Sequence, residues 1–170
     1  MRFENRYPLL VAGVSGCGKS SFGEAWARRC AAPFIEGDRY HSPESIAKMS
    51  AGIPLEDADR SAWLDRITDA AQAQRGVPGP VLACSALKRS YRDRLRAGIP
   101  GLRTVLLEIP RELAIGRVAH RSGHYMPVSL VDSQFSTLEL PHDEPRTMLL
   151  DASRPIGTMM DATESWLAAQ

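Results

Sequence analysis

The sequence feature that most constrains this chain is a glycine-rich segment near its N-terminus, Gly13-Val14-Ser15-Gly16-Cys17-Gly18-Lys19-Ser20. It is a full match to the phosphate-loop pattern of a glycine, four residues, then glycine, lysine and serine or threonine. The apolar run at 9–12 before it predicts a buried strand, and the pattern after Lys19 predicts a helix with Phe22 and Trp26 on one face. Strand, glycine-rich turn and helix in this order are the setting in which the motif holds the phosphates of a nucleotide.

Each residue type in this loop has a physical role in binding phosphate. The glycines allow the backbone to curl with its amides turned inward, and these amides join the positive end of the following helix to form an anion-binding site. Lys19 adds a positive charge that can reach the outer phosphates, and the Ser20 hydroxyl is the expected ligand of a magnesium ion. We expect the nucleotide to contact the whole loop: Gly13, Val14, Ser15, Gly16, Cys17, Gly18, Lys19, Ser20 and Ser21.

Composition argues against several other classes of protein. With 170 residues and a net charge of +1, the chain predicts a single domain over 1–170 that has no general attraction to nucleic acid. No apolar run approaches the roughly 20 residues that span a bilayer, and the N-terminus lacks the apolar core of a secretory signal. The three cysteines have no metal-type spacing, and their odd number argues against a disulfide framework. We expect a cytoplasmic protein that does not bind membranes.

Short apolar runs alternate with helical patterns along the chain. The runs cover 9–14, 33–36, 80–84, 104–109 and 147–150, and most of the connections between them are long enough for a helix. This alternation is typical of an α/β fold in which helices cover both faces of a parallel sheet. Ligands of such folds bind beyond the carboxyl ends of the strands, so the residues after each run are the candidates for a site.

The segment after the second run contains a candidate catalytic carboxylate. Asp38 would emerge near the terminal phosphate, where it could orient an attacking hydroxyl and accept its proton. The alternative is a helix cap or a turn, although Ser42 with Pro43 supplies another cap nearby. His41 is a candidate substrate contact, with an ordinary surface position as the alternative. Arg60 lies in the first turn of the next predicted helix, where a positive charge is unfavourable, which indicates another role.

Basic residues crowd into 88–96, directly after the third run. Lys88, Arg89 and Arg92 lie closest to the sheet edge, where an arginine could bind a substrate carboxylate through two parallel hydrogen bonds. We expect Arg94 and Arg96 to face solvent. The alternative for the whole segment is a solvated helix face.

A lid is predicted at about 118–140. Arg117 and Arg121 are four residues apart and project from the same side of a helix, which Gly123 then breaks before a second helical pattern begins. Closure of such a segment would exclude water, and Arg121 would neutralise charge on the transferring phosphoryl group. Surface ion pairs are the alternative for these arginines.

Five sequence blocks together resemble the gluconate kinase (gluconokinase) family of small phosphate-loop kinases, relatives of shikimate and nucleoside monophosphate kinases. They are "GVSGCGKS", "GDRYH", "IAKMSAGIPLEDADRSAWL", "CSALKRSYRDRLR" and "GHYMPVSLVDSQFSTLE", and the resemblance runs from about Leu10 to Trp166. It implies ATP-dependent phosphorylation of D-gluconate at the 6-hydroxyl, with magnesium, by a cytosolic homodimer. It also implies a three-layer fold with a five-stranded parallel sheet in the order 2-3-1-4-5 and a helical lid.

The resemblance also assigns roles to individual residues. It implies that Lys19, Asp38 and Arg121 are catalytic and that Ser20 binds the metal. The implied substrate contacts are Asp38, His41, Arg60, Lys88, Arg89, Arg92, His124 and Gln134. Arg117 and Pro155 would lie by the adenine.

Two alternatives to a gluconate kinase remain open. One is a kinase for another small hydroxy acid, such as shikimate, or for a nucleotide, because substrate pockets diverge faster than phosphate loops. The other is a nucleotide-dependent switch. A guanine switch would carry the tetrapeptide Asn-Lys-x-Asp, which does not occur in this chain.

Overall fold

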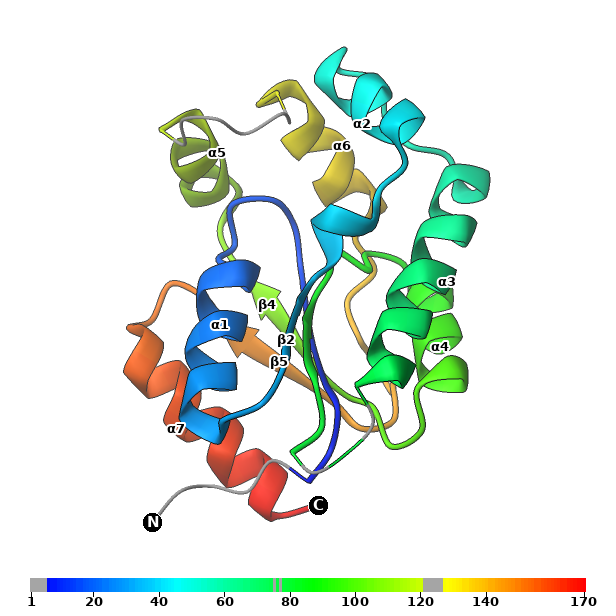
Figure 1. Cartoon of the computed structure of the whole chain (residues 1–170). Helices are drawn as coiled ribbons and strands as arrows, with labels where there is room; N and C mark the ends of the chain where they lie inside the picture. The colour runs from blue at the N-terminus through cyan, green and yellow to red at the C-terminus, as the bar shows by residue number, and fades with distance from the viewer. Residues whose placement is uncertain (1–5, 75, 77, 121–126) are drawn as a thin grey trace.

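The computed structural model describes residues 6–74, 76, 78–120 and 127–170. Within these ranges the apolar runs form one parallel sheet with the strand order β2-β3-β1-β4-β5 (Figure 1). The strands are β1 (Leu9–Ala12), β2 (Phe34–Glu36), β3 (Val81–Ala83), β4 (Arg103–Glu108) and β5 (Thr147–Asp151). The five predicted strands and their predicted order are therefore confirmed, with ends that differ by one or two residues.

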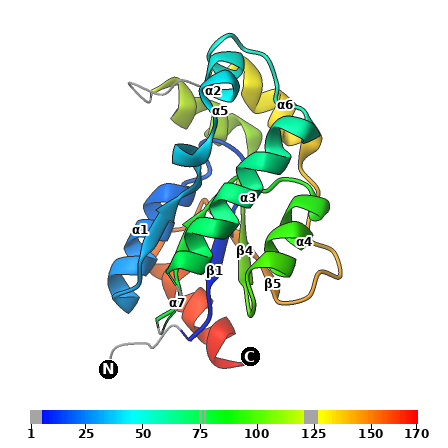
Figure 2. The same ribbon diagram turned by 45° about the vertical axis from the view of Figure 1, so that its right-hand side comes forward.

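Helices cover both faces of this sheet (Figures 1 and 2). Their bounds are α1 (Lys19–Cys30), α2 (Pro43–Ser50), α3 (Asp57–Ala73), α4 (Arg89–Gly98), α5 (Arg111–Ala119), α6 (Ser129–Thr137) and α7 (Ile156–Ala168), with a 3-10 helix η1 (Gly37–Tyr40) after β2. In both views α1 and α7 lie on one face and α3 and α4 on the other. The predicted three-layer α/β fold is confirmed.

The central strand explains why the first apolar run does not alternate with polar residues. Leu9 and Val11 belong to a core cluster with apolar residues of α1 and α7. Leu10 and Ala12 belong to a second cluster with residues of α3 and α4. Successive side chains of a strand point to opposite faces, so a strand that is covered on both sides must be apolar throughout. All four residues are 0% exposed.

Three helices lie beyond the carboxyl ends of the strands, where α/β folds bind ligands (Figures 1 and 2). These are α2, α5 and α6, and a small cluster of Met49, Leu55 and Leu130 joins α2 and the following loop to α6. Part of the predicted lid, 121–126, lies outside the described residues. None of the described helices is long and apolar enough to cross a bilayer.

Candidate functional site

The phosphate loop has the backbone conformation that its glycines predict. Gly13, Gly16 and Gly18 have φ values of 144°, 81° and 95°, a region that residues with side chains rarely adopt. A Cβ at Gly16 would lie 2.5 Å from the carbonyl oxygen of Ala114, so this position also lacks room for a side chain. The loop is thereby packed closely against α5 while its other side borders a cavity.

This nucleotide cavity has a volume of about 580 Å³. It is lined by Ser15, Gly16, Cys17, Gly18, Lys19, Ser20, Ser21, Phe22, Asp38, Arg117, His120, Ala152, Arg154, Ile156 and Met159. The structure thus brings together most of the predicted loop residues with Asp38 and Arg117, which come from distant parts of the chain. Gly13 and Val14 are not in the lining, and Pro155 lies between two lining residues as the N-cap of α7.

The two cations of the predicted nucleotide site contact the loop itself. The Lys19 ammonium donates a 3.0 Å hydrogen bond to the Val14 carbonyl oxygen. The Arg117 guanidinium donates to the carbonyl oxygens of Gly16, at 3.3 Å, and Ala152, at 3.4 Å. Arg117 therefore bridges the loop to the segment after β5. His120, one turn further along the chain near the end of α5, lines the same cavity and was not predicted.

Asp38 lies on η1, directly after β2, and is not a cap of α2. Ser42 is that cap, since its hydroxyl accepts a 3.1 Å hydrogen bond from the Ser45 backbone N–H, and Pro43 starts the helix. The capping alternative for Asp38 is therefore wrong. Its carboxylate is available to the cavity, with its side chain 39% exposed.

Glu36 is a functional candidate that sequence reasoning missed. Burial together with the nearby Asp38 charge raises the pKa of its carboxyl, against the opposing effect of the neighbouring Ser20 hydroxyl. Because Glu36 is the last residue of β2, it sits at the carboxyl edge of the sheet beside the phosphate loop. Its place at the end of a predicted strand is the signal in the sequence that points to it.

His41 lies behind Asp38 and in neither cavity. Its ring stacks on Trp63, with centroids 4.3 Å apart and planes 12° apart, and its Nε2 atom lies 3.9 Å from an oxygen of Asp38. Burial lowers the pKa of His41 to about 4, against the opposing effect of Asp38 and with help from the charges of Arg60 and Arg66. At neutral pH it is therefore an uncharged ring beside Asp38, and the structure does not bring it into the cavity lining.

A second cavity of about 300 Å³ adjoins the first. It is lined by Pro54, Leu55, Glu56, Asp57, Arg60, Lys88, Tyr91, Ser133, Gln134 and Thr137. We call it the acid cavity, because it collects three of the predicted substrate contacts: Arg60, Lys88 and Gln134. The two cavities share a wall, since the Ser15 backbone N–H donates a 2.6 Å hydrogen bond to Gln134 Oε1.

The cations of the acid cavity differ in how they are paired. Lys88 forms a 2.7 Å ion pair with Asp57, and the Tyr91 hydroxyl also donates to Asp57. These two hydrogen bonds lower the pKa of Asp57. Arg60 lies over the Tyr91 ring, 5.6 Å from its centroid, and forms no ion pair with any carboxylate in the described part of the chain. Arg60 is therefore the cation in this cavity best placed to receive an anion.

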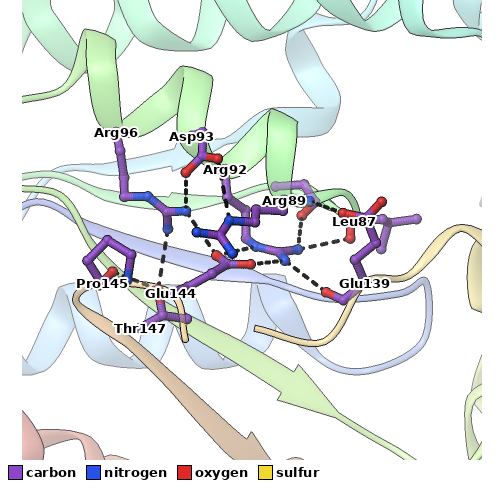
Figure 3. A network of polar contacts seen from close by, with 10 residues as sticks. Leu87, Arg89, Arg92, Asp93, Arg96, Glu139, Glu144, Pro145 and Thr147 are labelled. Carbon is purple, nitrogen blue, oxygen red and sulfur yellow. Dashed lines mark hydrogen bonds and ion pairs between the residues drawn. The ribbon is translucent and has the colours of Figure 1, made fainter. Parts of the chain in front are cut away.

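The structure does not support Arg92 as a substrate contact, and this prediction is corrected. Its side chain is 0% exposed, and its guanidinium donates five hydrogen bonds within the chain (Figure 3). Two go to Glu144 and three to the carbonyl oxygens of Ala86, Leu87 and Glu139. An arginine has five N–H donors, so none remains for a ligand.

Two further predictions about the basic segment have different outcomes. Arg96 does not face solvent, because its side chain is 6% exposed and forms ion pairs with Glu144 and Asp93. Arg94 does lie at the surface, 46% exposed and paired with Asp65. The partner Glu144 is 52 residues from Arg92 along the chain, so no local spacing could reveal it.

The remaining predicted residues lie outside the two cavities or outside the described residues. The Arg89 side chain is 51% exposed and lies 3.7 Å from Asp93, away from the acid cavity. Arg121 and His124 fall in 121–126, which the structure does not describe.

Comparisons with known proteins agree with this geometry. A family model described as shikimate kinase matches residues 15–155. The thermosensitive gluconokinase of Escherichia coli (strain K12) is 40% identical over 156 residues, which cover 90% of this chain and 83% of that protein. The gluconokinase of Gluconobacter oxydans (strain 621H) is 44% identical over 137 residues, which cover 80% and 77%. The crystal structure of a gluconokinase from Sinorhizobium meliloti 1021 has a TM-score of 0.85 at 47% identity and covers 99% of this chain and 94% of that chain. The chain therefore belongs to the gluconokinase family, within the shikimate kinase group of phosphate-loop proteins.

Proposed function

We propose that this protein transfers the terminal phosphoryl group of ATP to the 6-hydroxyl of D-gluconate, giving 6-phospho-D-gluconate and ADP. One observation carries the proposal. Asp38 lines the cavity formed by the phosphate loop, and the adjoining cavity contains an arginine, Arg60, without a carboxylate partner among the described residues. A phosphate-binding loop, a carboxylate and a cation for the substrate acid are the groups that such a transfer requires. The sequence identity to gluconokinases supports the choice of acid.

In this proposal some residues of the chain bind the phosphates, and Asp38 accepts the proton of the substrate hydroxyl. The amides of Gly16, Gly18, Lys19 and Ser20 bind the β- and γ-phosphates, whereas the Ser15 N–H is held by Gln134. The Lys19 ammonium turns from the Val14 carbonyl to the charge that develops in transfer. Asp38 orients the 6-hydroxyl toward the terminal phosphate and accepts its proton. His41, uncharged and stacked on Trp63, keeps η1 and its carboxylate in place.

Magnesium is implied by this chemistry, and the residues at the loop fit it. Ser20 and Glu36 are neighbours that offer hard oxygen ligands, and Ser20 and Asp38 line the same cavity. The described residues contain no group of three or more His, Cys, Asp or Glu side chains that could hold a metal. Few protein ligands are the norm for magnesium, which takes its other ligands from water and phosphate. When bound, the ion neutralises charge on the phosphate oxygens.

Arg60 is the proposed partner of the gluconate carboxylate, with Lys88 as a second cation on the same wall. Arg121 and His124 stay proposed lid residues, and Arg117 and Pro155 proposed neighbours of the adenine. We also infer a cytosolic homodimer, from the family resemblance. The three cysteines are free, as in proteins of a reducing compartment.

A panel of acids tests the proposal. A coupled assay that measures ADP release would compare D-gluconate with other sugar acids, shikimate and nucleoside monophosphates. We expect turnover with gluconate to exceed turnover with every other compound by at least about 100-fold, because an acid without the matching polar groups would leave polar groups of the site unpaired. Faster turnover with shikimate or a nucleotide would contradict the assignment of gluconate while leaving the kinase assignment intact.

A further inference from the structure

One hydrogen bond joins the phosphate loop to the acid cavity. The Ser15 N–H donates to Gln134 Oε1 at 2.6 Å, and the two residues are 9% and 7% exposed. Ser15 lines the nucleotide cavity, whereas Gln134 lines the acid cavity. A side-chain oxygen of α6 thus holds an amide of the loop that receives the phosphates.

The helix that carries Gln134 is itself held by the elements around the acid. Near its start, Leu130 packs with Met49 and Leu55 of α2 and its following loop. Just beyond its end, the Glu139 N–H donates to the Leu87 carbonyl oxygen at 2.9 Å. Figure 3 shows the Arg92 guanidinium at this same point, where it donates to the Glu139 carbonyl oxygen at 2.8 Å. The position of α6 is therefore set by α2 on one side and by the start of α4 on the other.

We propose that Gln134 is a positioning residue that couples the acid site to the nucleotide site. Through its hydrogen bond to the Ser15 N–H, the Gln134 side chain fixes the position of the phosphate loop relative to α6, which forms part of the wall of the acid cavity. A shift of α6 on acid binding then reaches the loop directly, and by thermodynamic reciprocity nucleotide binding changes the affinity for the acid by the same factor. The inference rests on the proposed function, since it takes the acid to be gluconate.

The substitution Gln134→Leu tests this role, because leucine nearly preserves the volume and removes the acceptor. The buried Ser15 N–H would lose its partner and the loop would shift, and a misplacement of about 1 Å costs on the order of 100-fold in rate. We expect kcat to fall about 10- to 100-fold, with the KM values for ATP and gluconate changing together, because reciprocal coupling alters both affinities by the same factor. Calorimetry would give the gluconate Kd with and without a non-hydrolysable ATP analogue, and the ratio should fall toward one in Q134L.

Two further variants sharpen the test. Ser136→Ala is the matched control, since Ser136 is on the exposed face of α6 and, among the described residues, donates to the Asp132 carbonyl oxygen alone. Its kcat and its Kd ratio should equal those of the wild type. Ser15→Pro removes the donor of the same bond, so the effects of S15P and Q134L on kcat should be clearly non-additive in a double-mutant cycle.

The outcomes separate this inference from the function it builds on. A Q134L variant with wild-type kcat and Kd ratio would overturn the coupling, as would one in which only the KM for gluconate rises, which would make Gln134 a plain substrate contact. A wild type that binds the ATP analogue but does not turn over gluconate would overturn the proposed function and the inference with it. Thermal unfolding of each variant would show whether the variant is still folded, and so whether a lower kcat reflects a change in the site.

Discussion

Replacing Arg92 by alanine should destabilise this protein without weakening gluconate binding. The change leaves the Glu144 carboxylate, 1% exposed, with Arg96 as its remaining partner, and takes the donor from three carbonyl groups. Removing one member of a buried ion pair costs about 3–5 kcal/mol. We therefore expect the free energy of unfolding to fall by that amount. At roughly 2–4 °C per kcal/mol for a chain of this size, the thermal midpoint should fall by about 6–20 °C.

The assay combines unfolding with kinetics. Urea unfolding followed by circular dichroism would give the free energy, and kinetics at a temperature where the variant stays folded would give KM for gluconate. Arg94→Ala is the matched control on the same helix, since its ion pair with Asp65 is exposed and should contribute less than about 1 kcal/mol. We expect KM for gluconate to stay within about twofold of the wild type in both variants.

One result would refute this reasoning. If Arg92→Ala unfolds like the wild type and raises KM for gluconate ten- to a hundredfold, the guanidinium binds the substrate and its internal hydrogen bonds contribute little. A double-mutant cycle with Glu144→Ala adds a second check. Because the two groups are in contact, the combined loss should be smaller than the sum of the single losses by more than about 0.5 kcal/mol.

Four further predictions concern the site and the buried pair. Lys19→Met should abolish turnover and shift the ligand-free thermal midpoint by less than about 4 °C, because the hydrogen bond that its side chain makes within the described structure is to its own loop. A large shift would contradict that position. Asp38→Asn should lower kcat by about two to four orders of magnitude if the carboxylate is the base, and a kinetic assay that finds full activity would leave it a structural role. Arg60→Ala should raise KM for gluconate about 10- to 100-fold through loss of a charged hydrogen bond worth roughly 1.5–3 kcal/mol, whereas an unchanged KM would exclude it as the carboxylate partner. Burial raises the pKa of Glu144, but hydrogen bonds from Arg92 and Arg96 outweigh burial and hold this pKa below its usual value of 4.5. The ionised carboxylate therefore stabilises the folded protein above pH 4.5, and this stabilisation is lost as the pH falls through the lowered pKa of the folded state. Unfolding free energies measured from pH 6 to 3 should therefore decline more steeply in the wild type than in Arg92→Ala.

The parts of this protein that could be predicted from sequence are those that depend on neighbours along the chain. The phosphate loop needs glycine at positions with positive φ, and Gly13, Gly16 and Gly18 occur in the order that the motif requires. The strands follow from apolar runs, and a parallel order follows from the helical length of most connections. Asp38, which lines the nucleotide cavity, could be proposed from the sequence because ligands of this fold bind beyond the strand ends, and Asp38 follows a predicted strand.

In the basic segment, the sequence does not predict which cations are buried and which line a cavity. Lys88 and Arg92 are four residues apart and looked equally suited to bind an acid. The helix turns them into different surroundings, so that Lys88 lines the cavity and Arg92 lies in the core. Arg92 is buried because it pairs with Glu144, a residue of the loop before β5 that lies close to it only in the folded protein.

By itself, then, the sequence determined the phosphate loop, the parallel sheet and the edge of the sheet that borders the cavities, because each follows from local backbone conformation and from which side chains avoid water. Tertiary structure alone decided which charged side chains remain available to a ligand. An ion pair forms between groups that folding brings within about 4 Å. Separation along the chain does not reveal that distance, so the buried Arg92 and the available Arg60 could be told apart only in the folded molecule.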